Sequence, residues 1–227
     1  LLLEENRRAL RERYDVPVEL FVGDLAARET REELVDAAAA FGPVDLLVNN
    51  AGFGLRGGFL DESSAAHAAM LAIHNELSVM LCHALGKEMV QSGGGIIINV
   101  SSLASLFPVP GGSTYAATKS FLTLFSESLS VELAPHGVYV QALLPGFTYT
   151  DFHRYMADVA RFHKSTGPLP WTAAERVVRC SLRKAGISAG RQTARESGRQ
   201  KAPRRAVTRQ VICVPGFRNR LAYAAAK

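Results

Sequence analysis

The feature that most constrains the fold of this chain is an alternation, over its first 150 residues, of short apolar runs with longer helix-like stretches. Four runs are rich in Val, Ile and Leu and end in turn residues: 18–23, 44–50, 95–102 and 138–145. Runs that are apolar throughout are expected of strands buried on both faces of a sheet. Strands that alternate with helices predict an α/β fold whose parallel sheet is covered on both sides.

The helix-like stretches lie between these runs, at residues 30–41, about 65–91 and 113–134. Thr30 with Glu33 three residues later forms a capping-box pattern, which predicts a helix start, and Gly42 is a stop signal. Residues 1–14 alternate Leu with Arg and Glu, which is typical of an amphipathic helix and not of a signal peptide.

The pattern weakens after residue 150. Residues 151–170 suit a flap of short helices, and residues 172–184 predict a helix with Thr172 as its cap. Residues 210–217 regain strand character. We expect one domain over residues 1–227, because this length suffices for a single α/β core.

The net charge of +5 comes from one segment. Residues 183–209 carry nine Arg or Lys and one acid, Glu196, so the rest of the chain has a net charge of −3. Within this segment, residues 185–209 hold almost no large apolar side chain, and we expect a disordered or poorly packed insertion. A nucleic-acid contact is the alternative, but no aromatic residues are interleaved, so a solvated tail is favoured.

Composition sets the remaining bounds. No apolar run reaches the roughly 18 residues that a membrane span needs. The three cysteines and six histidines show neither a disulfide framework nor metal-ligand spacing. These features predict a cytoplasmic protein that contacts no membrane and holds no metal.

The ends of the predicted strands are where chemistry is expected. In open parallel sheets, ligands bind beyond the carboxyl ends of the strands. Those ends are Asp24, residues 49–52, residues 101–102 and residues 145–150.

Ser102, Tyr115 and Lys119 form the strongest chemical pattern. Tyr115 and Lys119 are four residues apart on a predicted helix and therefore share one face. A nearby ammonium favours the phenolate and lowers the pKa of a tyrosine, which suits proton exchange with an alcohol near neutral pH. Ser102 could donate a hydrogen bond to a carbonyl oxygen. By itself the Tyr-Lys spacing is weak, and an ordinary surface pair would look the same.

Four motifs in order carry a resemblance. VDLLVNNAG, INVSS, YAATK and LLPGFTYT resemble the short-chain dehydrogenase/reductase family in order and spacing, with Ser102 thirteen residues before Tyr115. The similarity covers about residues 18–155. It implies a Rossmann-like, doubly wound parallel sheet. It also implies hydride transfer between a nicotinamide cofactor, NADP or NAD, and a small-molecule carbonyl compound or secondary alcohol.

The resemblance implies four catalytic residues. Tyr115 would be the general acid and base, and Lys119 would lower its pKa and bind the nicotinamide ribose. Ser102 would polarise the carbonyl. Asn75 would complete a proton relay through water to Lys119; an ordinary polar residue within a helix is the alternative.

The same resemblance implies a set of cofactor-binding residues. Besides Tyr115 and Lys119, they are Asp24, Leu25, Asn49, Asn50, Ala51, Gly52, Pro145, Gly146, Thr148 and Thr150. Asp24 would meet the adenine, although a turn aspartate is the alternative. The turn at 49–52 would support the sheet as well as the cofactor, and the loop at 145–150 would orient the carboxamide.

An apolar substrate is suggested by a group of residues near the predicted site. They are Phe107, Val109, Phe147, Phe152 and Tyr155. If they line its mouth, the substrate is apolar; packing within the core or flap is equally compatible with the sequence.

The family's Gly-rich turn between its first strand and first helix does not appear in this sequence. By this resemblance, we expect the first βα unit and most of the second strand of the family's sheet to be missing. We expect weak or no dinucleotide binding by this chain, a groove at the centre of the sheet and an exposed apolar edge.

Two functions from different classes remain open: an oxidoreductase, and an impaired or non-catalytic remnant of the same fold. An epimerase fits less well, because it would need a larger C-terminal substrate domain. The family's assembly through the helices at 65–91 and 113–134 implies a homodimer or homotetramer.

Overall fold

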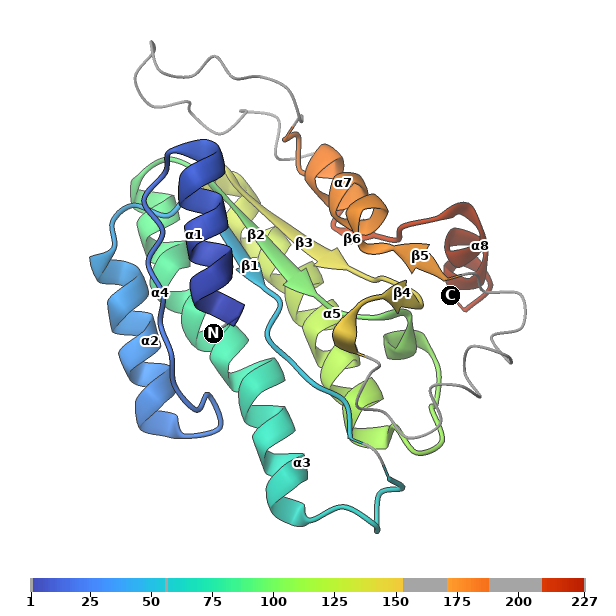
Figure 1. Cartoon of the computed structure of the whole chain (residues 1–227). Helices are drawn as coiled ribbons and strands as arrows, with labels where there is room; N and C mark the ends of the chain where they lie inside the picture. The colour runs from blue at the N-terminus through green and yellow to red at the C-terminus, as the bar shows by residue number, and fades with distance from the viewer. Residues whose placement is uncertain (1, 56, 153–170, 188–209, 227) are drawn as a thin grey trace.

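The computed structural model describes residues 2–55, 57–152, 171–187 and 210–226. Its centre is a four-stranded parallel sheet with the order β1-β2-β3-β6 (Figure 1). The strands are β1 (Leu46–Asn49), β2 (Gly95–Val100), β3 (Val138–Leu143) and β6 (Ile212–Cys213). The predicted α/β fold with a parallel sheet is confirmed.

The sheet is covered on both faces, as a doubly wound fold requires. Alternation along β2 sends neighbouring residues to opposite sides. Ile97 packs in a cluster with Leu85 and Met89 of one helical layer, whereas Ile98 packs with Val177 and Cys213 on the other side. Both isoleucines are almost fully buried.

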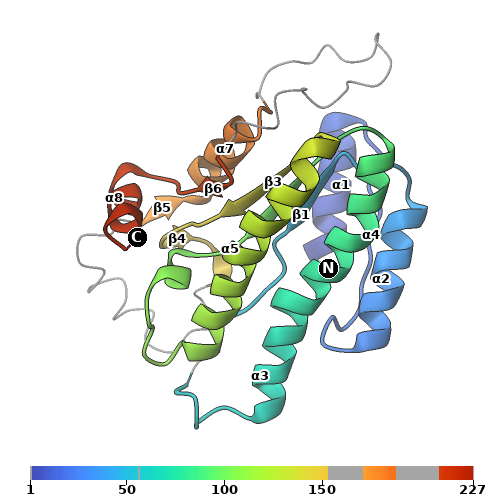
Figure 2. The ribbon, with the colours of Figure 1, turned by 180° about the vertical axis from the view of Figure 1, so that it is seen from behind.

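The first helical layer contains α4 (Leu77–Gln91) and α5 (Ser113–Leu133), which lie side by side over the sheet (Figure 2). The expected helix over 65–91 is present, but it has three parts: α3 (Ser64–Leu71), a π-helical turn η1 (Ala72–Glu76), and α4. α2 (Arg28–Ala40) packs beside α4.

The opposite face carries α7 (Ala174–Lys184), and α8 (Phe217–Ala225) lies nearby at the end of the described chain. A small second sheet pairs β4 (Thr148–Tyr149) with β5 (Thr172–Ala173). It anchors the loop after β3 to the start of α7. Two short 3-10 turns, η2 (Leu103–Leu106) and η3 (Ala134–His136), flank α5.

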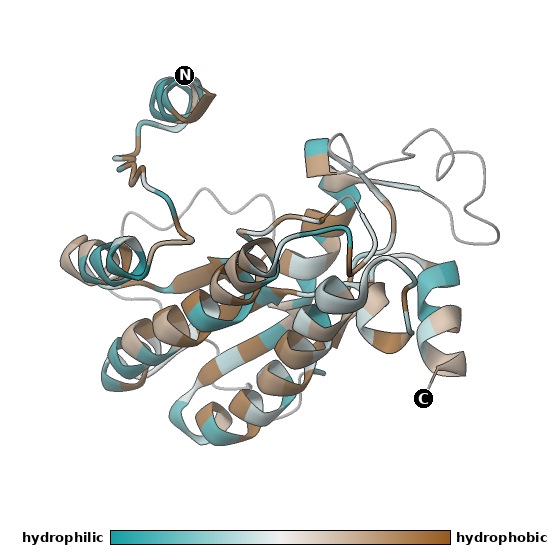
Figure 3. Ribbon diagram, turned by 90° about the horizontal axis from the view of Figure 1, so that it is seen from below, coloured by the Kyte–Doolittle hydropathy of each residue, from teal (hydrophilic) through white to brown (hydrophobic). Residues whose placement is uncertain are grey.

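The N-terminal helix, α1 (Leu2–Tyr14), is amphipathic as expected but has no buried residue. Figure 3 shows it standing off from the body of the protein. It therefore contributes nothing to the core.

The strand expected at 18–23 is wrong. These residues form neither a helix nor a strand and pair with no strand of the described sheets. A strand needs a hydrogen-bonded neighbour, and local apolar character cannot supply one.

Two predicted helix caps are also wrong. Thr30 is not a cap, because α2 begins two residues earlier, after Ala27. Thr172 pairs in β5, and Ala173 precedes α7 instead. The stop at Gly42 is confirmed by its φ of 128°, a left-handed value that favours glycine.

The apolar run at 210–217 forms a shorter strand than predicted. Only Ile212 and Cys213 pair with β3, and α8 starts at Phe217. The chain turns between them through Pro215 and Gly216, and Gly216 has a φ of 91°.

β1 is one of the two edge strands of the described sheet, and it exposes apolar side chains, as expected. Leu46 is 37% exposed and Val48 is 48% exposed, although buried strands normally hide such residues. The run Ser64–Gln91 is long and apolar enough, by length and composition alone, to cross a membrane. Its inward residues Cys82, Leu85 and Met89 pack on the sheet, which accounts for its composition.

Several predictions fall on residues outside the described ranges. The flap is described only at residues 151–152, and Tyr155 lies beyond them. Of the basic segment, only the first part is described: Ala185 is buried and caps α7, so it belongs to the domain core and not to an unpacked insertion.

Candidate active site

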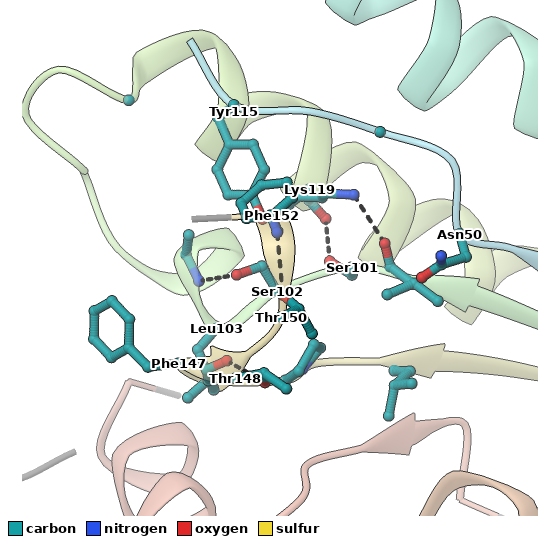
Figure 4. A pocket seen from close by; sticks show the side chains of 18 of the residues that line it. Asn50, Ser101, Ser102, Leu103, Tyr115, Lys119, Phe147, Thr148, Thr150 and Phe152 are labelled. Carbon is teal, nitrogen blue, oxygen red and sulfur yellow. Dashed lines mark hydrogen bonds between the residues drawn. The ribbon is translucent and has the colours of Figure 1, made fainter. Parts of the chain in front are cut away.

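Ser102, Tyr115 and Lys119 line one cavity at the carboxyl end of the sheet (Figure 4). Ser102 follows β2, and the other two lie one turn apart on α5. The elements meet there because α5 packs along β2 and β3. The three side chains that the sequence singled out are therefore brought together.

The Ser102 hydroxyl has one of its hydrogen-bonding roles fixed. The Ala104 backbone N–H donates to Ser102 Oγ at 3.1 Å. Because this bond uses an oxygen lone pair, the hydroxyl hydrogen stays available to donate to another group. Ser102 can therefore donate a hydrogen bond into the cavity.

Tyr115 is positioned beside Ser102 and between two rings. Its ring lies 5.9 Å from the His74 ring and 5.8 Å from the Phe152 ring. Burial raises the pKa of Tyr115, and a hydrogen bond with Ser102 partly offsets the rise. This direction is opposite to the expected lowering, because the effect of burial outweighs that of the Ser102 hydrogen bond. The phenol is therefore protonated at neutral pH and ready to act as an acid.

Lys119 is a buried cation. Its side chain is 6% exposed, and its Nζ donates to the Val100 carbonyl at 2.9 Å. The Nζ lies 5.6 Å from the centroid of the Tyr115 ring. Burial lowers the pKa of Lys119 to about 8, so the ammonium still holds its proton at pH 7.

Asn75 does not line the cavity but is hydrogen-bonded to α5. It lies in the π-helical turn, and its Nδ2 donates to the Thr118 carbonyl at 3.0 Å. Single π turns are frequent at functional sites because they redirect neighbouring side chains.

His74, next to Asn75, is an unforeseen part of the site. It is 1% exposed; its Nδ1 is 2.9 Å from Thr118 Oγ1, and the Phe53 N–H donates to its Nε2 at 3.0 Å. The expectation that the histidines are satisfied or exposed is confirmed for His74. Burial and the Lys119 charge lower its pKa to about 3.

This lowered pKa makes stability depend on pH. In the folded chain His74 stays neutral down to about pH 3, whereas in the unfolded chain it takes up a proton near pH 6.5. Stability is therefore fully present above pH 6.5 and falls by about 1.4 kcal/mol per pH unit below it. The free energy of unfolding, measured in urea, should fall between pH 7 and pH 5 by about 2 kcal/mol more in the wild type than in His74→Asn.

The matched control is His83→Gln, because His83 is exposed on α4. This variant should keep the wild-type difference between the two pH values. An identical difference in His74→Asn and the wild type would contradict the buried, neutral state of His74.

The four residues at 49–52 divide between core and cavity. Asn49 points inward and donates to Asn99 Oδ1 at 2.8 Å, and Asn99 donates to Ser126 Oγ at 2.9 Å. Asn50 and Gly52 line the cavity, whereas Ala51 does not. Asn49 therefore stabilises the packing of the sheet, which is one of the two roles expected for the turn at 49–52.

Asp24 and Leu25 lie away from this cavity. Asp24 is exposed, and its Oδ1 accepts from the Ala26 N–H at 2.9 Å. It is therefore a turn aspartate, which was the alternative to its expected contact with the adenine. Arg31 donates to the Leu25 carbonyl at 3.0 Å and to Glu76 Oε2 at 2.8 Å. The turn at Asp24 is thus tied to the π-helical turn.

The loop after β3 brings Pro145, Gly146, Thr148 and Thr150 to the cavity. Thr148 Oγ1 donates to the Gly146 carbonyl at 3.0 Å, which leaves its oxygen able to accept. Thr150 Oγ1 accepts from the Phe152 N–H at 3.4 Å, which leaves its hydrogen able to donate. An acceptor beside a donor matches the two ends of a carboxamide.

The cavity has a volume of about 740 Å³ and mostly apolar walls. Phe107, Val109, Phe147 and Phe152 line it, as expected, and Trp171 stacks on Phe147 with ring centroids 5.4 Å apart. Val48, Ile98 and Val100 of the sheet also line it, which places a groove over the sheet.

Among the described residues, no group of three or more His, Cys, Asp or Glu side chains is arranged to hold a metal ion. His74, Thr118 and Trp171 are the site residues that the sequence did not reveal. The only feature of the sequence that could have pointed to His74 is its position directly before Asn75.

The geometry defines an α/β protein with a serine, a tyrosine and a lysine at the carboxyl edge of a parallel sheet. Residues 2–159 match the profile of the family described as short chain dehydrogenase. The chain belongs to this family.

Curated relatives agree with this assignment. The 2,5-dichloro-2,5-cyclohexadiene-1,4-diol dehydrogenase LinX of Sphingobium indicum is 37% identical over 110 residues, which cover 48% of this chain and 44% of LinX. Carbonyl reductase (NADPH) 2 of Sus scrofa is 31% identical over 157 residues, covering 67% of this chain and 62% of the reductase. The chain thus spans about half the length of the first relatives it matches.

A solved structure is similar over nearly the whole chain. A short-chain dehydrogenase from Sphingobium yanoikuyae in complex with NADPH is 25% identical and has a TM-score of 0.78. The similarity covers 98% of this chain and 77% of that one.

Proposed function

We propose that this chain is an oxidoreductase that uses NADP or NAD and transfers a hydride between the nicotinamide and an apolar carbonyl compound or secondary alcohol. The observation that carries the proposal is the convergence of Ser102, Tyr115 and Lys119 on one apolar cavity. Membership of the short-chain dehydrogenase family and the NADPH-bound solved relative support it.

The residues present fit the nicotinamide half of such a cofactor. Lys119 has three N–H donors, and its one described hydrogen bond goes to Val100, so two donors suit ribose hydroxyls. Thr148 and Thr150 offer the acceptor and donor that a carboxamide needs. When bound, the cofactor would supply or accept the hydride, because no side chain can.

The protein's task is to handle the proton. In the direction of reduction, Ser102 donates a hydrogen bond to the carbonyl oxygen and polarises it. The Tyr115 hydroxyl gives its proton to that oxygen as the carbon gains the hydride, so the carbonyl becomes an alcohol. The Lys119 ammonium stabilises the phenolate that remains. In the reverse direction, the phenolate takes the proton back.

The second candidate is a remnant of the fold without firm cofactor binding. The observation that favours it is the exposed edge at Leu46 and Val48. The described residues also include no Gly-rich turn that leads from a strand directly into a helix.

A fluorescence titration separates these two candidates. We expect reduced nicotinamide mononucleotide, which lacks the adenosine half, to bind this chain within about tenfold of NADPH, a difference of about 1.4 kcal/mol. The reason is that the described contacts hold only the nicotinamide half. Circular dichroism of the same sample checks folding.

Three outcomes are informative. Saturable binding of both compounds supports the oxidoreductase, and binding of neither by a folded chain supports the remnant. Micromolar NADPH binding with no binding of the mononucleotide would contradict the assignment of the nicotinamide site, because the adenosine half would then supply the affinity.

We also propose that the chain assembles into a homodimer or homotetramer through α4 and α5. Three apolar side chains of α5 support this: Phe121, Leu124 and Val131 are 44%, 66% and 75% exposed. Exposed apolar residues gathered on one helix are typical of an interface.

A further inference from the structure

His74 joins the loop after β1 to the catalytic helix by a directed chain of hydrogen bonds. The Phe53 N–H donates to His74 Nε2, so this nitrogen carries no hydrogen. The Thr118 hydroxyl donates to the Tyr115 carbonyl at 2.8 Å, so its hydrogen is used. His74 Nδ1 must therefore carry the ring hydrogen and donate to Thr118 Oγ1. Every link has one donor and one acceptor.

Packing leaves little freedom around this ring. The His74 ring meets the rings of Phe53 and Tyr115 edge to face, at 5.9 Å in each case. A Cβ added at Gly52 would lie 2.6 Å from His74 Nε2, so only glycine lets the loop approach this closely. The ring thus sets the distance between the loop and α5.

The residues that follow His74 extend the same connection. Asn75 bonds to the Thr118 carbonyl, and Glu76 accepts from Arg31. Three consecutive residues of the π-helical turn therefore reach α5, the loop at Gly52 and the turn at Leu25. Of these, His74 alone bonds to both the loop and α5.

We propose that His74 is a positioning residue, which holds Tyr115 through Thr118 and the cavity loop through Phe53. The proposal rests on the function proposed above for the kinetic consequences, but not for the hydrogen-bond chain itself. The two bonds of the ring have separate tasks. The bond from Nδ1 to Thr118 positions Tyr115, the proposed proton donor. The bond from the Phe53 N–H to Nε2 positions the loop that lines the cavity, where the cofactor would bind.

The hydrogen-bond chain is tested first, without any turnover. Nitrogen-15 NMR of the histidine-labelled chain at pH 7, with His74→Asn used to assign the signal, reports which ring nitrogen carries hydrogen. We expect hydrogen on Nδ1 only. Hydrogen on Nε2, or a ring that averages between the two forms, would overturn the proposal.

The two tasks are tested by two variants. An asparagine amide reaches about as far as Nδ1 and a glutamine amide about as far as Nε2. His74→Asn should keep kcat and raise the KM for NADPH about tenfold, because the loop loses its support. His74→Gln should keep that KM and lower kcat about tenfold or more, because Tyr115 shifts.

The control is again His83→Gln, which should leave both constants unchanged. The proposal would be overturned if both His74 variants showed the same decrease in kcat and the same increase in KM, in proportion to their loss of thermal stability. That result would indicate a merely structural role. If the wild type shows no turnover, the proposed function fails, and the NMR result still decides the role of His74 in the hydrogen-bond chain.

Discussion

Replacing Tyr115 by phenylalanine is expected to lower kcat by about 10²–10⁴-fold, which removes measurable turnover. The change deletes one oxygen atom, and with it the hydroxyl that forms a hydrogen bond with Ser102 in the cavity. The ring contacts with His74 and Phe152 do not need the hydroxyl. Folding and NADPH affinity should therefore stay nearly unchanged.

The measurement compares NADPH oxidation and NADPH binding in the wild type and in Tyr115→Phe. Ser101→Ala is not a suitable control, since Ser101 bonds to the backbone of Lys119. His83→Gln is suitable, because His83 lies on the exposed side of α4. Retained turnover in Tyr115→Phe would show that another group transfers the proton.

Replacing Lys119 by methionine should have opposite effects on activity and stability. Burial lowers the pKa of Lys119 from 10.5 to about 8, so holding the charged form in the fold costs about 3 kcal/mol at neutral pH. Methionine fills a similar volume without a charge, although it leaves the Val100 carbonyl without its donor at a cost of about 1–3 kcal/mol. Stability should stay equal or rise, while turnover falls by about 10²-fold or more.

Linkage gives this variant a second signature. Between pH 8 and 10.5 the unfolded chain keeps a proton on Lys119 that the folded chain has lost. Stability from this group therefore rises with pH in that window and is lost as pH falls. Urea unfolding across the window should show this rise in the wild type and not in Lys119→Met. A less stable variant with an unchanged pH dependence would contradict the buried, partly titrated lysine.

The sheet and the convergence of Ser102, Tyr115 and Lys119 on one cavity could be predicted from sequence, because each has a local signal. Runs such as residues 95–100 are mostly apolar, which is expected of a strand buried on both faces. Tyr115 and Lys119 are four residues apart, and a helix places that spacing on one face. The rule that ligands lie at strand ends then placed Ser102 beside them.

The errors arose where structure depends on distant partners. Residues 18–23 have the composition of a strand, but a strand forms only where another strand offers hydrogen bonds. Thr172 has the chemistry of a helix cap, yet pairing with Thr148 takes it into β5. The pKa of Tyr115 was predicted in the wrong direction because the spacing to Lys119 reveals the charge but not the burial.

His74 shows what a single sequence conceals. A histidine within a helix gives no sign of its partners, and two of them, Phe53 and Thr118, are distant in the sequence. The π-helical turn that directs it has no signal in composition. Only the packing of α5 against the loop after β1 reveals its place.

The most direct test of the central claim follows the absorbance of NADPH at 340 nm while an aryl ketone is added to the folded chain. The wild type should oxidise NADPH only when the ketone is present, and Tyr115→Phe, folded to the same extent, should not. Equal rates in the two proteins, or no ketone-dependent oxidation by a wild-type chain that is saturated with NADPH, would contradict the assignment of Tyr115, Ser102 and Lys119 as the catalytic set.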